Sequence, residues 1–297
     1  MQINAGTTRI EIDDQGPTSG EPLLLIMGLG MQLTAWPEPL VQGLLARGFR
    51  VIRMDNRDAG LSQGFDHLGV PNLALAGLRY TLRLRAKVPY RLADMASDAL
   101  GVMDALGLPR AHVCGASLGG MVAQHLASSQ PQRVSSLTLM MSTSGSRRLP
   151  QPAMRVRAAL LSRPASAAPA DVVAHLQRVF RVIGSPDFPT ADDVQVRRLH
   201  DMVTRAWRPA GTARQLAAVM ADGDRTALLA GITAPTCVIH GRSDPLVPVA
   251  AGIELAARIP GAVADLVDGM GHDLPAALLP RFADAIRVNA NRATGVG

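Results

Sequence analysis

Gly115-Ala116-Ser117-Leu118-Gly119 is the most informative stretch of the sequence. An apolar run, residues 111–114, precedes it, and a run with helical spacing, residues 120–129, follows it. A Gly-x-Ser-x-Gly pattern between a strand and a helix is typical of a sharp turn that lifts a nucleophilic serine above the edge of a sheet. Small residues are needed beside the serine, because the backbones of the strand and the helix approach closely there. The pattern also recurs by chance, so its interpretation depends on the rest of the chain.

Outside this stretch, segments with strand-like and helix-like patterns alternate along the chain. This alternation predicts an α/β fold, with a mostly parallel central sheet flanked by helices. The expected strands, the first of them in an N-terminal hairpin, are residues 8–13, 23–27, 49–54, 111–114, 134–141, 236–240 and 263–267. The expected helices are residues 36–47, 95–106, 120–129, 248–259 and 278–288.

The alternation stops between residues 145 and 231. This region is rich in alanine, arginine and proline, and its apolar residues have helical spacing, as at Val172, Leu176, Val179, Phe180 and Ile183. We therefore expect an α/β core made of residues 1–144 and 232–297, interrupted by a helical insertion over residues 145–231.

Composition places the chain among ordinary globular proteins. It has 297 residues, of which 47% are apolar and 18% charged. No apolar run approaches the ~18 residues of a membrane span, so we expect no stable insertion into a membrane. The N-terminus lacks the basic start and apolar core of a signal peptide, which favours a cytoplasmic protein. Cys114 and Cys237 fall in expected strands and are interpreted as reduced core residues.

The net charge of +6 is unevenly distributed. Between Gly145 and Thr226 there are 13 arginines and 7 aspartates but no glutamate, and a second basic stretch contains Arg79, Arg83, Arg85, Lys87 and Arg91. The simplest interpretation is a solvated, arginine-rich surface. The alternative is a positive field that attracts anionic substrates or an anionic surface. Nucleic-acid binding is not expected, because aromatic residues are 3% of the chain and no readout motif is present.

A serine hydroxyl needs a general base, and the base needs a carboxylate that fixes its tautomer. Asp244 follows the expected strand at residues 236–240 and is the only carboxylate between Thr226 and Glu254. His272 lies in a glycine-flanked loop after the last expected strand. The candidate catalytic residues are therefore Ser117, Asp244 and His272, although Asp244 could also be a simple turn former and His272 one of seven loop or core histidines.

These motifs together resemble the α/β-hydrolase family over essentially the full length of the chain. Ser, Asp and His occur in that family's order. Further matches are Met27-Gly28-Leu29-Gly30 after one strand and Asp55-Asn56-Arg57-Asp58-Ala59-Gly60-Leu61-Ser62 after the next. The first and the Asn-Arg-Asp-x-Gly variant most resemble small bacterial carboxylesterases of the aclacinomycin methylesterase type.

Hydrolysis of an ester needs two backbone donors for the oxyanion. One is expected to be the N–H of Leu118, which follows the nucleophile. The resemblance implies that the other is the N–H of Leu29, and that the insertion covers the site as a cap. Gly28 and Gly30 do not indicate a dinucleotide site, because the third glycine of that pattern is replaced by Leu33. No metal-binding spacing occurs, and we expect neither a metal nor another cofactor.

The sequence therefore predicts a serine hydrolase that cleaves carboxylic esters through an acyl-enzyme, with a small-molecule ester as its substrate. Carbon–carbon bond hydrolysis, iminopeptidase action and cofactor-free perhydrolysis use the same three residues and remain open. A non-catalytic receptor for a small ligand, built on the same scaffold, is the alternative from another class. The oligomeric state has no signature in the sequence.

Overall fold

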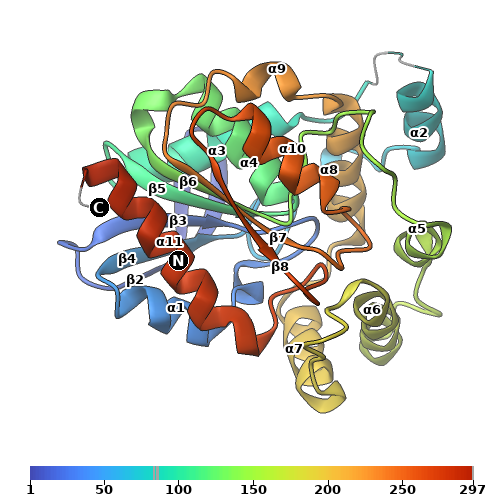
Figure 1. Cartoon of the computed structure of the whole chain (residues 1–297). Helices are drawn as coiled ribbons and strands as arrows, with labels where there is room; N and C mark the ends of the chain where they lie inside the picture. Colours follow the sequence, from blue (N-terminus) through green and yellow to red (C-terminus); the bar gives the residue numbers. More distant parts are fainter. Residues whose placement is uncertain (83, 85–86, 296–297) are drawn as a thin grey trace.

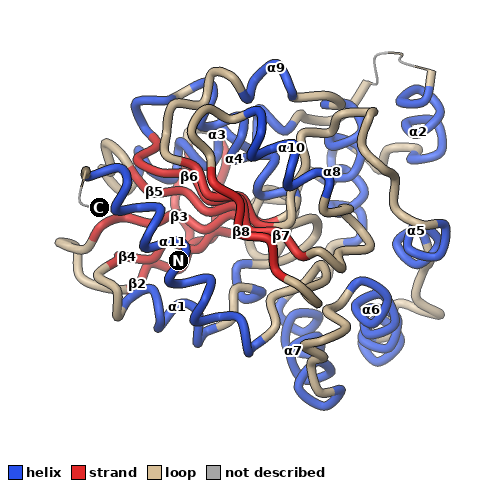
Figure 2. Tube along the Cα trace, in the orientation of Figure 1, coloured by secondary structure: helices blue, strands red, loops and turns tan. Residues whose placement is uncertain are grey.

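A computed structural model describes residues 1–82, 84 and 87–295 of the chain. Within these residues, eight strands form one sheet in the order β1-β2-β4-β3-β5-β6-β7-β8 (Figures 1 and 2). β2 pairs antiparallel with β1 and β4, and all other neighbours are parallel, which confirms the predicted mostly parallel sheet. The strands are β1 (Gln2–Ala5), β2 (Thr8–Gln15), β3 (Glu21–Ile26), β4 (Phe49–Met54), β5 (Ala111–Ala116), β6 (Val134–Met140), β7 (Thr236–Gly241) and β8 (Val263–Val267).

Helices cover both faces of the sheet (Figure 1). The apolar run of β3 is continuous because both of its faces are buried: Leu24 packs toward the side of α3 and α4, and Leu25 toward the side of α1 and α11. These core helices are α1 (Glu38–Leu45), α3 (Leu92–Ala105), α4 (Leu118–Ser129), α10 (Ala250–Arg258) and α11 (Leu279–Thr294). No helix among the described residues is both long and apolar enough to cross a bilayer.

The regular elements between β6 and β7 are all helices, joined by loops. They are α5 (Met154–Leu161), α6 (Pro169–Ile183), α7 (Asp192–Arg205), α8 (Pro209–Asp222) and α9 (Thr226–Leu229). α6 and α7 pack around a small apolar cluster that includes Val172, Leu199 and Met202. α8 packs against α2 (Leu73–Thr81) and α3, and α9 packs against α4 and α10. This helical region is therefore joined to the core at several points.

Several elements differ from the sequence prediction. α2 was not expected, although Leu75, Leu78 and Leu82 have helical spacing. α1 begins at Glu38 rather than residue 36, because Pro37 is its N-cap and has extended backbone angles. α11 continues six residues beyond residue 288, since the buried Asn289 side chain donates hydrogen bonds to the carbonyls of Leu137 and Pro235.

Candidate active site

The carboxyl ends of the parallel strands meet at one edge of the sheet, where open α/β sheets bind ligands. Ser117 follows β5, Asp244 follows β7 and His272 follows β8. The structure brings these three side chains together. His272 Nε2 lies 3.0 Å from Ser117 Oγ, and His272 Nδ1 lies 2.7 Å from Asp244 Oδ2. Asp244 and His272 are 5% and 8% exposed, so water competes little for these hydrogen bonds.

Ser117 sits on a strained turn between β5 and α4. Its φ of 54° and ψ of −117° are unusual for a residue with a side chain. The turn is possible because its neighbours are glycines. A Cβ on Gly115 would lie 2.3 Å from the carbonyl oxygen of Gly119, and one on Gly119 would lie 2.0 Å from that of Ile26. The Ser117 N–H is held by the carbonyl of Met140 on β6 at 2.9 Å.

Asp244 accepts three hydrogen bonds. Its Oδ1 receives the N–H groups of Leu246 and Val247 at 2.9 and 2.8 Å, and its Oδ2 receives His272 Nδ1–H. The two N–H groups hold Oδ1, and Oδ2 is thereby left facing the histidine. The neighbouring His240 is buried and donates from Nε2 to the carbonyl of Val247 at 2.8 Å.

The loop after β3 passes directly beside the serine. A Cβ on Gly28 would lie 3.3 Å from Ser117 Cβ and 3.8 Å from Ser117 Oγ. The N–H groups of Leu29 and Leu118 donate to no acceptor within the described part of the chain. Leu29 lies in the loop after β3 and Leu118 directly follows Ser117, so both unused N–H groups belong to segments beside the serine. An oxyanion site requires two such donors.

The helical region holds this loop in place. Gly30 N–H donates to Gln215 Oε1 of α8 at 2.8 Å, and Gln215 Nε2 donates to the carbonyl of Arg57 at 2.7 Å. The Gln215 side chain is fully buried. Gln32 Nε2 donates to the carbonyls of Met202 and Ala206, at the end of α7, at 2.7 and 2.6 Å. The loop is therefore tied to α7 and α8 by buried hydrogen bonds.

The loop of His272 is tied to the same region at another point. His272 N–H donates to the carbonyl of Ile183, the last residue of α6, at 2.7 Å. Gly271 N–H donates to Ser185 Oγ at 2.8 Å, and the Ser185 hydroxyl in turn donates to Asp273. Burial raises the pKa of Asp273, against the hydrogen bonds from Ser185 that lower it.

Asp55 and Arg57, which belong to the motif after β4, hold loops near the site. Asp55 accepts the N–H groups of Leu33 and Leu61 at 2.6 and 2.9 Å, and pairs with Arg205 of α7 at 2.8 Å. Burial raises the pKa of Asp55, and these donors oppose the rise. Arg57 pairs with the buried Asp98 of α3.

Asp58 forms the most deeply buried charge pair between the helical region and the core. Its carboxylate accepts two hydrogen bonds from Arg214 of α8, at 2.8 and 2.7 Å, and one from the Tyr90 hydroxyl at 2.7 Å. Burial alone would raise the pKa of Asp58, but the donors from Arg214, Phe65 N–H and Tyr90 outweigh it, and the net shift is downward. Asp58 also has a φ of 67°, in the left-handed region.

Most of the arginines in the helical region are exposed to solvent. Of the 13 between Gly145 and Thr226, nine are exposed: Arg147, Arg148, Arg155, Arg157, Arg163, Arg178, Arg181, Arg197 and Arg198. Arg214 and Arg225 are buried and paired with Asp58 and Asp222. The positive charge of this region therefore lies mainly on its outer surface.

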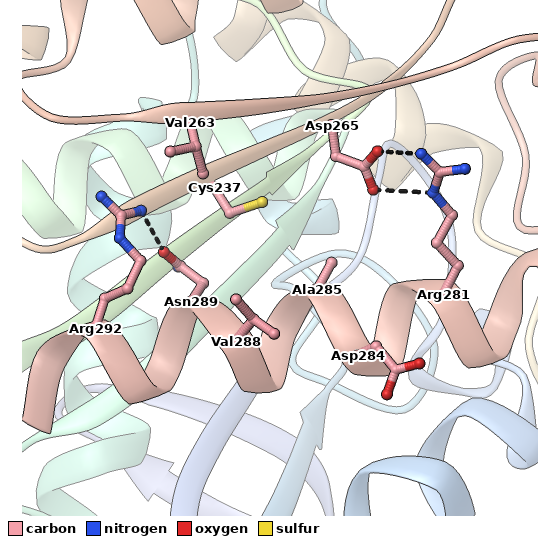
Figure 3. Close-up of a pocket in the computed structure, with 9 residues that line it drawn as sticks. All are labelled: Cys237, Val263, Asp265, Arg281, Asp284, Ala285, Val288, Asn289 and Arg292. Atoms are coloured by element: carbon pink, nitrogen blue, oxygen red, sulfur yellow. Dashed lines mark hydrogen bonds and ion pairs between the residues drawn. The ribbon is translucent and has the colours of Figure 1, made fainter. Parts of the chain in front are cut away.

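Neither cysteine belongs to the site. Cys114 and Cys237 are free and buried, and burial raises the pKa of Cys237 to about 11. Cys237 lies at the amino end of β7 and lines a shallow groove between β8 and α11 (Figure 3). That groove contains none of the predicted site residues. Among the described residues, no three His, Cys, Asp or Glu side chains gather as metal ligands would.

Sequence reasoning missed the residues that support the site. Gln32, Ser185, Arg214 and Gln215 carry no recognisable motif, and their partners are far away in the chain. Gly30 and Gln215, for example, are 185 residues apart. Only the polar character of these residues in otherwise apolar stretches could have drawn attention to them.

Comparison with known proteins identifies the family. A family model for the alpha/beta hydrolase fold matches residues 21–274, so the chain belongs to the α/β-hydrolase family. A rhodomycin D methylesterase of Streptomyces sp. (strain C5) is 31% identical over 94% of each chain. A 2-hydroxy-6-oxononadienedioate/2-hydroxy-6-oxononatrienedioate hydrolase of Cupriavidus pinatubonensis is 30% identical and covers 89% of this chain and 84% of that protein.

Solved structures agree on the fold. A meta-cleavage product hydrolase from Pseudomonas fluorescens IP01 superposes with a TM-score of 0.75 at 19% identity, and the match covers 99% of this chain and 98% of that one. The protein is accordingly a hydrolase with esterases among its relatives.

Proposed function

We propose that the protein is a serine hydrolase that cleaves carboxylic esters. The observation that carries the proposal is the continuous hydrogen-bonded series Ser117–His272–Asp244 at the carboxyl edge of the sheet. The methylesterase relative, which matches nearly the whole chain, supports an ester as the substrate. It also favours esters of a small alcohol.

In the proposed first step, Ser117 Oγ attacks the ester carbonyl while His272 Nε2 takes its proton. The resulting imidazolium donates from Nδ1 to the Asp244 carboxylate, which stabilises its charge. The N–H groups of Leu29 and Leu118 donate to the oxyanion of the tetrahedral intermediate. His272 then returns the proton to the leaving alkoxide, and an acyl-enzyme remains.

In the second step, a water molecule attacks the acyl-enzyme. His272 takes a proton from this water, the same two N–H groups stabilise the second oxyanion, and the proton returns to Ser117 as the carboxylic acid leaves. No further reactant is needed. This proposal assigns to Ser117, Asp244, His272, Leu29 and Leu118 the roles that the sequence predicts.

The helical region over residues 145–231 is proposed to be the cap of the site. Contacts from α6, α7 and α8 to the loops of Leu29 and His272 support this role. A cap in this position would shape the substrate pocket and also hold the catalytic loops in their places.

The first test is hydrolysis of p-nitrophenyl esters from acetate to decanoate. We expect turnover by the parent protein and a loss of at least about a thousandfold in kcat for Ser117→Ala. Ser129→Ala, at the exposed end of the same helix, is the matched control and should retain activity. Circular dichroism checks that all three proteins are folded. Equal activity of Ser117→Ala and the parent would contradict the proposal.

Carbon–carbon bond hydrolysis is the second candidate, because one relative is named for a 2-hydroxy-6-oxo dienedioate, a compound whose name contains no ester. A folded protein that is inactive on every ester, but whose Ser117 reacts with a fluorophosphonate, would favour this candidate. A folded protein whose Ser117 does not react with the probe would favour the non-catalytic receptor.

A further inference from the structure

Exposed apolar side chains are concentrated in two short segments of the chain. Among the described residues, fourteen large apolar side chains are exposed, and nine of them fall in residues 68–84 and 154–161. These nine are Leu68, Val70, Leu75, Leu78, Leu82, Leu84, Met154, Leu160 and Leu161. Singly exposed apolar residues are ordinary on protein surfaces, but a concentration of them marks an interaction site.

The exposed leucines of α2 form a row. Leu75, Leu78 and Leu82 are spaced i, i+3 and i+7 and are 47%, 54% and 57% exposed. This spacing places them along one side of the helix. The other side of α2 packs against α8, with Ala76 buried between. α2 therefore presents its more apolar side to solvent, which is the reverse of an ordinary surface helix.

α5 shows the same arrangement. Met154 and Leu161, at i and i+7, are 73% and 65% exposed, while Val156 on the other side is fully buried. Arg155 and Arg157 stand beside this row and are exposed. Neither forms an ion pair with another described residue.

The charge of the two segments is entirely positive. Residues 68–93 and 145–170 contain ten basic residues and no aspartate or glutamate. Arg83 and Arg85 are among the ten but lie outside the described residues. In the sequence, the basic stretch and the arginine-rich region are thus continuous with the segments that carry the exposed apolar rows.

The two segments adjoin one another. The Arg147 guanidinium lies over the Tyr80 ring, 4.5 Å from its centre, and also donates to the Tyr80 carbonyl. In Figures 1 and 2, α2 and α5 project from the same side of the molecule, beyond the sheet. We call the exposed side chains of residues 68–82 and 147–163 the α2/α5 face.

We infer that the α2/α5 face docks on the surface of an anionic lipid bilayer. Leucine and methionine rows can enter the boundary between headgroups and acyl chains, while the surrounding arginines bind the anionic headgroups. A second copy of this chain is a poor occupant, because two faces with only positive charge repel each other. The phosphates of a nucleic acid could bind the arginines, but the leucines would remain exposed to water.

The test is sedimentation of the full chain with vesicles of two compositions. We expect binding to vesicles made of equal parts phosphatidylcholine and phosphatidylglycerol, and much weaker binding to vesicles of phosphatidylcholine alone. Added sodium chloride should weaken the binding, because salt screens the attraction between arginines and headgroups.

Two sets of variants, with matched controls, locate the binding surface. Arg155→Glu with Arg157→Glu should lower the partition constant by about twenty-fivefold or more, since each basic residue near an anionic surface contributes about fivefold. The control is Arg178→Glu with Arg198→Glu, which changes exposed arginines of α6 and α7 and should bind nearly as the parent does.

The apolar row is tested separately. Leu75→Ser with Leu78→Ser should also reduce binding severalfold. The control is Ile253→Ser with Val288→Ser, at exposed positions outside the α2/α5 face, and it should not reduce binding.

Three results would overturn the inference. They are no binding of folded protein to the anionic vesicles, equal binding of the α2/α5 variants and their controls, or a dimer in sedimentation equilibrium that Leu75→Ser with Leu78→Ser makes monomeric. Hydrolysis of soluble p-nitrophenyl butyrate should be unchanged in all four double variants, because these side chains are exposed and none forms a hydrogen bond with Ser117, His272 or the loop of Leu29. Vesicle binding is measured without substrate, so its failure is distinguishable from failure of the proposed esterase activity.

Discussion

At the scale of single residues, the turn around Ser117 depends on the absence of side chains beside it. A methyl group on Gly119 would meet the backbone carbonyl of Ile26, and backbone cannot rotate away as a side chain can. The strained φ of Ser117 is therefore maintained by the close approach of β3, β5 and α4, and the serine is presented in one orientation.

We expect Gly119→Ala to destabilise the protein by more than about 3 kcal/mol, because the new Cβ would lie 2.0 Å from the Ile26 carbonyl oxygen. Urea unfolding followed by circular dichroism measures the change. Gly77→Ala in α2 is the control, since its Cβ meets nothing within 4 Å, and it should be neutral or stabilising by up to about 1 kcal/mol. Equal unfolding curves for Gly119→Ala and the parent would show that the turn can relax.

The buried pair of Asp58 and Arg214 supports a second prediction at this scale. Arg214→Met removes the charge that compensates a fully buried carboxylate. The free energy of unfolding should fall by about 3–5 kcal/mol. Arg181→Met, which breaks an exposed pair with Asp192, is the control and should cost less than about 1 kcal/mol. A loss for Arg214→Met no larger than that of the control would contradict the prediction.

At the scale of elements, the helices between β6 and β7 are joined to the loops that carry the chemistry. α8 holds the loop of Leu29 through Gln215, and the end of α6 holds the loop of His272 through its Ile183 carbonyl. A change in the packing of these helices would therefore move the Leu29 N–H, one of the two proposed oxyanion donors, relative to Ser117. Shape of the pocket and geometry of the reaction are thus coupled.

Gln215→Met tests this coupling. It retains the volume of the side chain but removes the acceptor of Gly30 N–H, so the loop of Leu29 loses its fixed position. We expect kcat for p-nitrophenyl butyrate to fall by about tenfold to a hundredfold with a small change in KM, because the oxyanion forms only during the reaction. Gln195→Met in α7 is the matched control and should retain activity. A change in KM alone would assign Gln215 to substrate binding instead.

The elements differ in how far the sequence predicts them. The strands were predicted from continuous apolar runs such as residues 23–27, and the positions of Ser117, Asp244 and His272 follow from the strands that precede them. α2 was missed although its leucines have helical spacing, and what the spacing could not show is that this apolar side faces solvent. The support given by Gln32, Ser185 and Gln215 was missed for another reason. It depends on contacts between residues far apart in the chain, and local patterns contain no information about them.

At the scale of the whole molecule, stability should depend on buried neutral histidines. Burial lowers the pKa of His240 against the opposing effects of the Val247 carbonyl and Asp244, and burial lowers the pKa of His112 against the effect of Glu21. Moreover, His240 Nδ1 is buried without a partner, so a proton there would find no acceptor. Below the unfolded pKa of about 6.5, the unfolded chain binds these protons and the folded protein resists them.

These histidines should therefore contribute less to the free energy of unfolding as pH falls from about 7 to about 5.5. The raised pKa values of the Asp55 and Asp273 carboxyls act in the opposite direction, so each variant is compared with the parent. Urea unfolding across this range measures the slope for each protein. His240→Gln should lose less stability than the parent as the pH falls, because one of the buried histidines no longer titrates. His200→Gln, at an exposed position of α7, should keep the slope of the parent. Equal slopes for His240→Gln and the parent would contradict the assignment.

The separation of Ser117 and His272 by 155 residues has a consequence for biosynthesis. During translation, the serine turn leaves the ribosome long before β8 and the histidine loop have been made. The proposed nucleophile therefore lacks its proposed base while the chain is incomplete, and a nascent chain that ends before β8 should not become acylated. If the proposed ester hydrolysis is observed, its gain during refolding would report when the loop of His272 reaches Ser117.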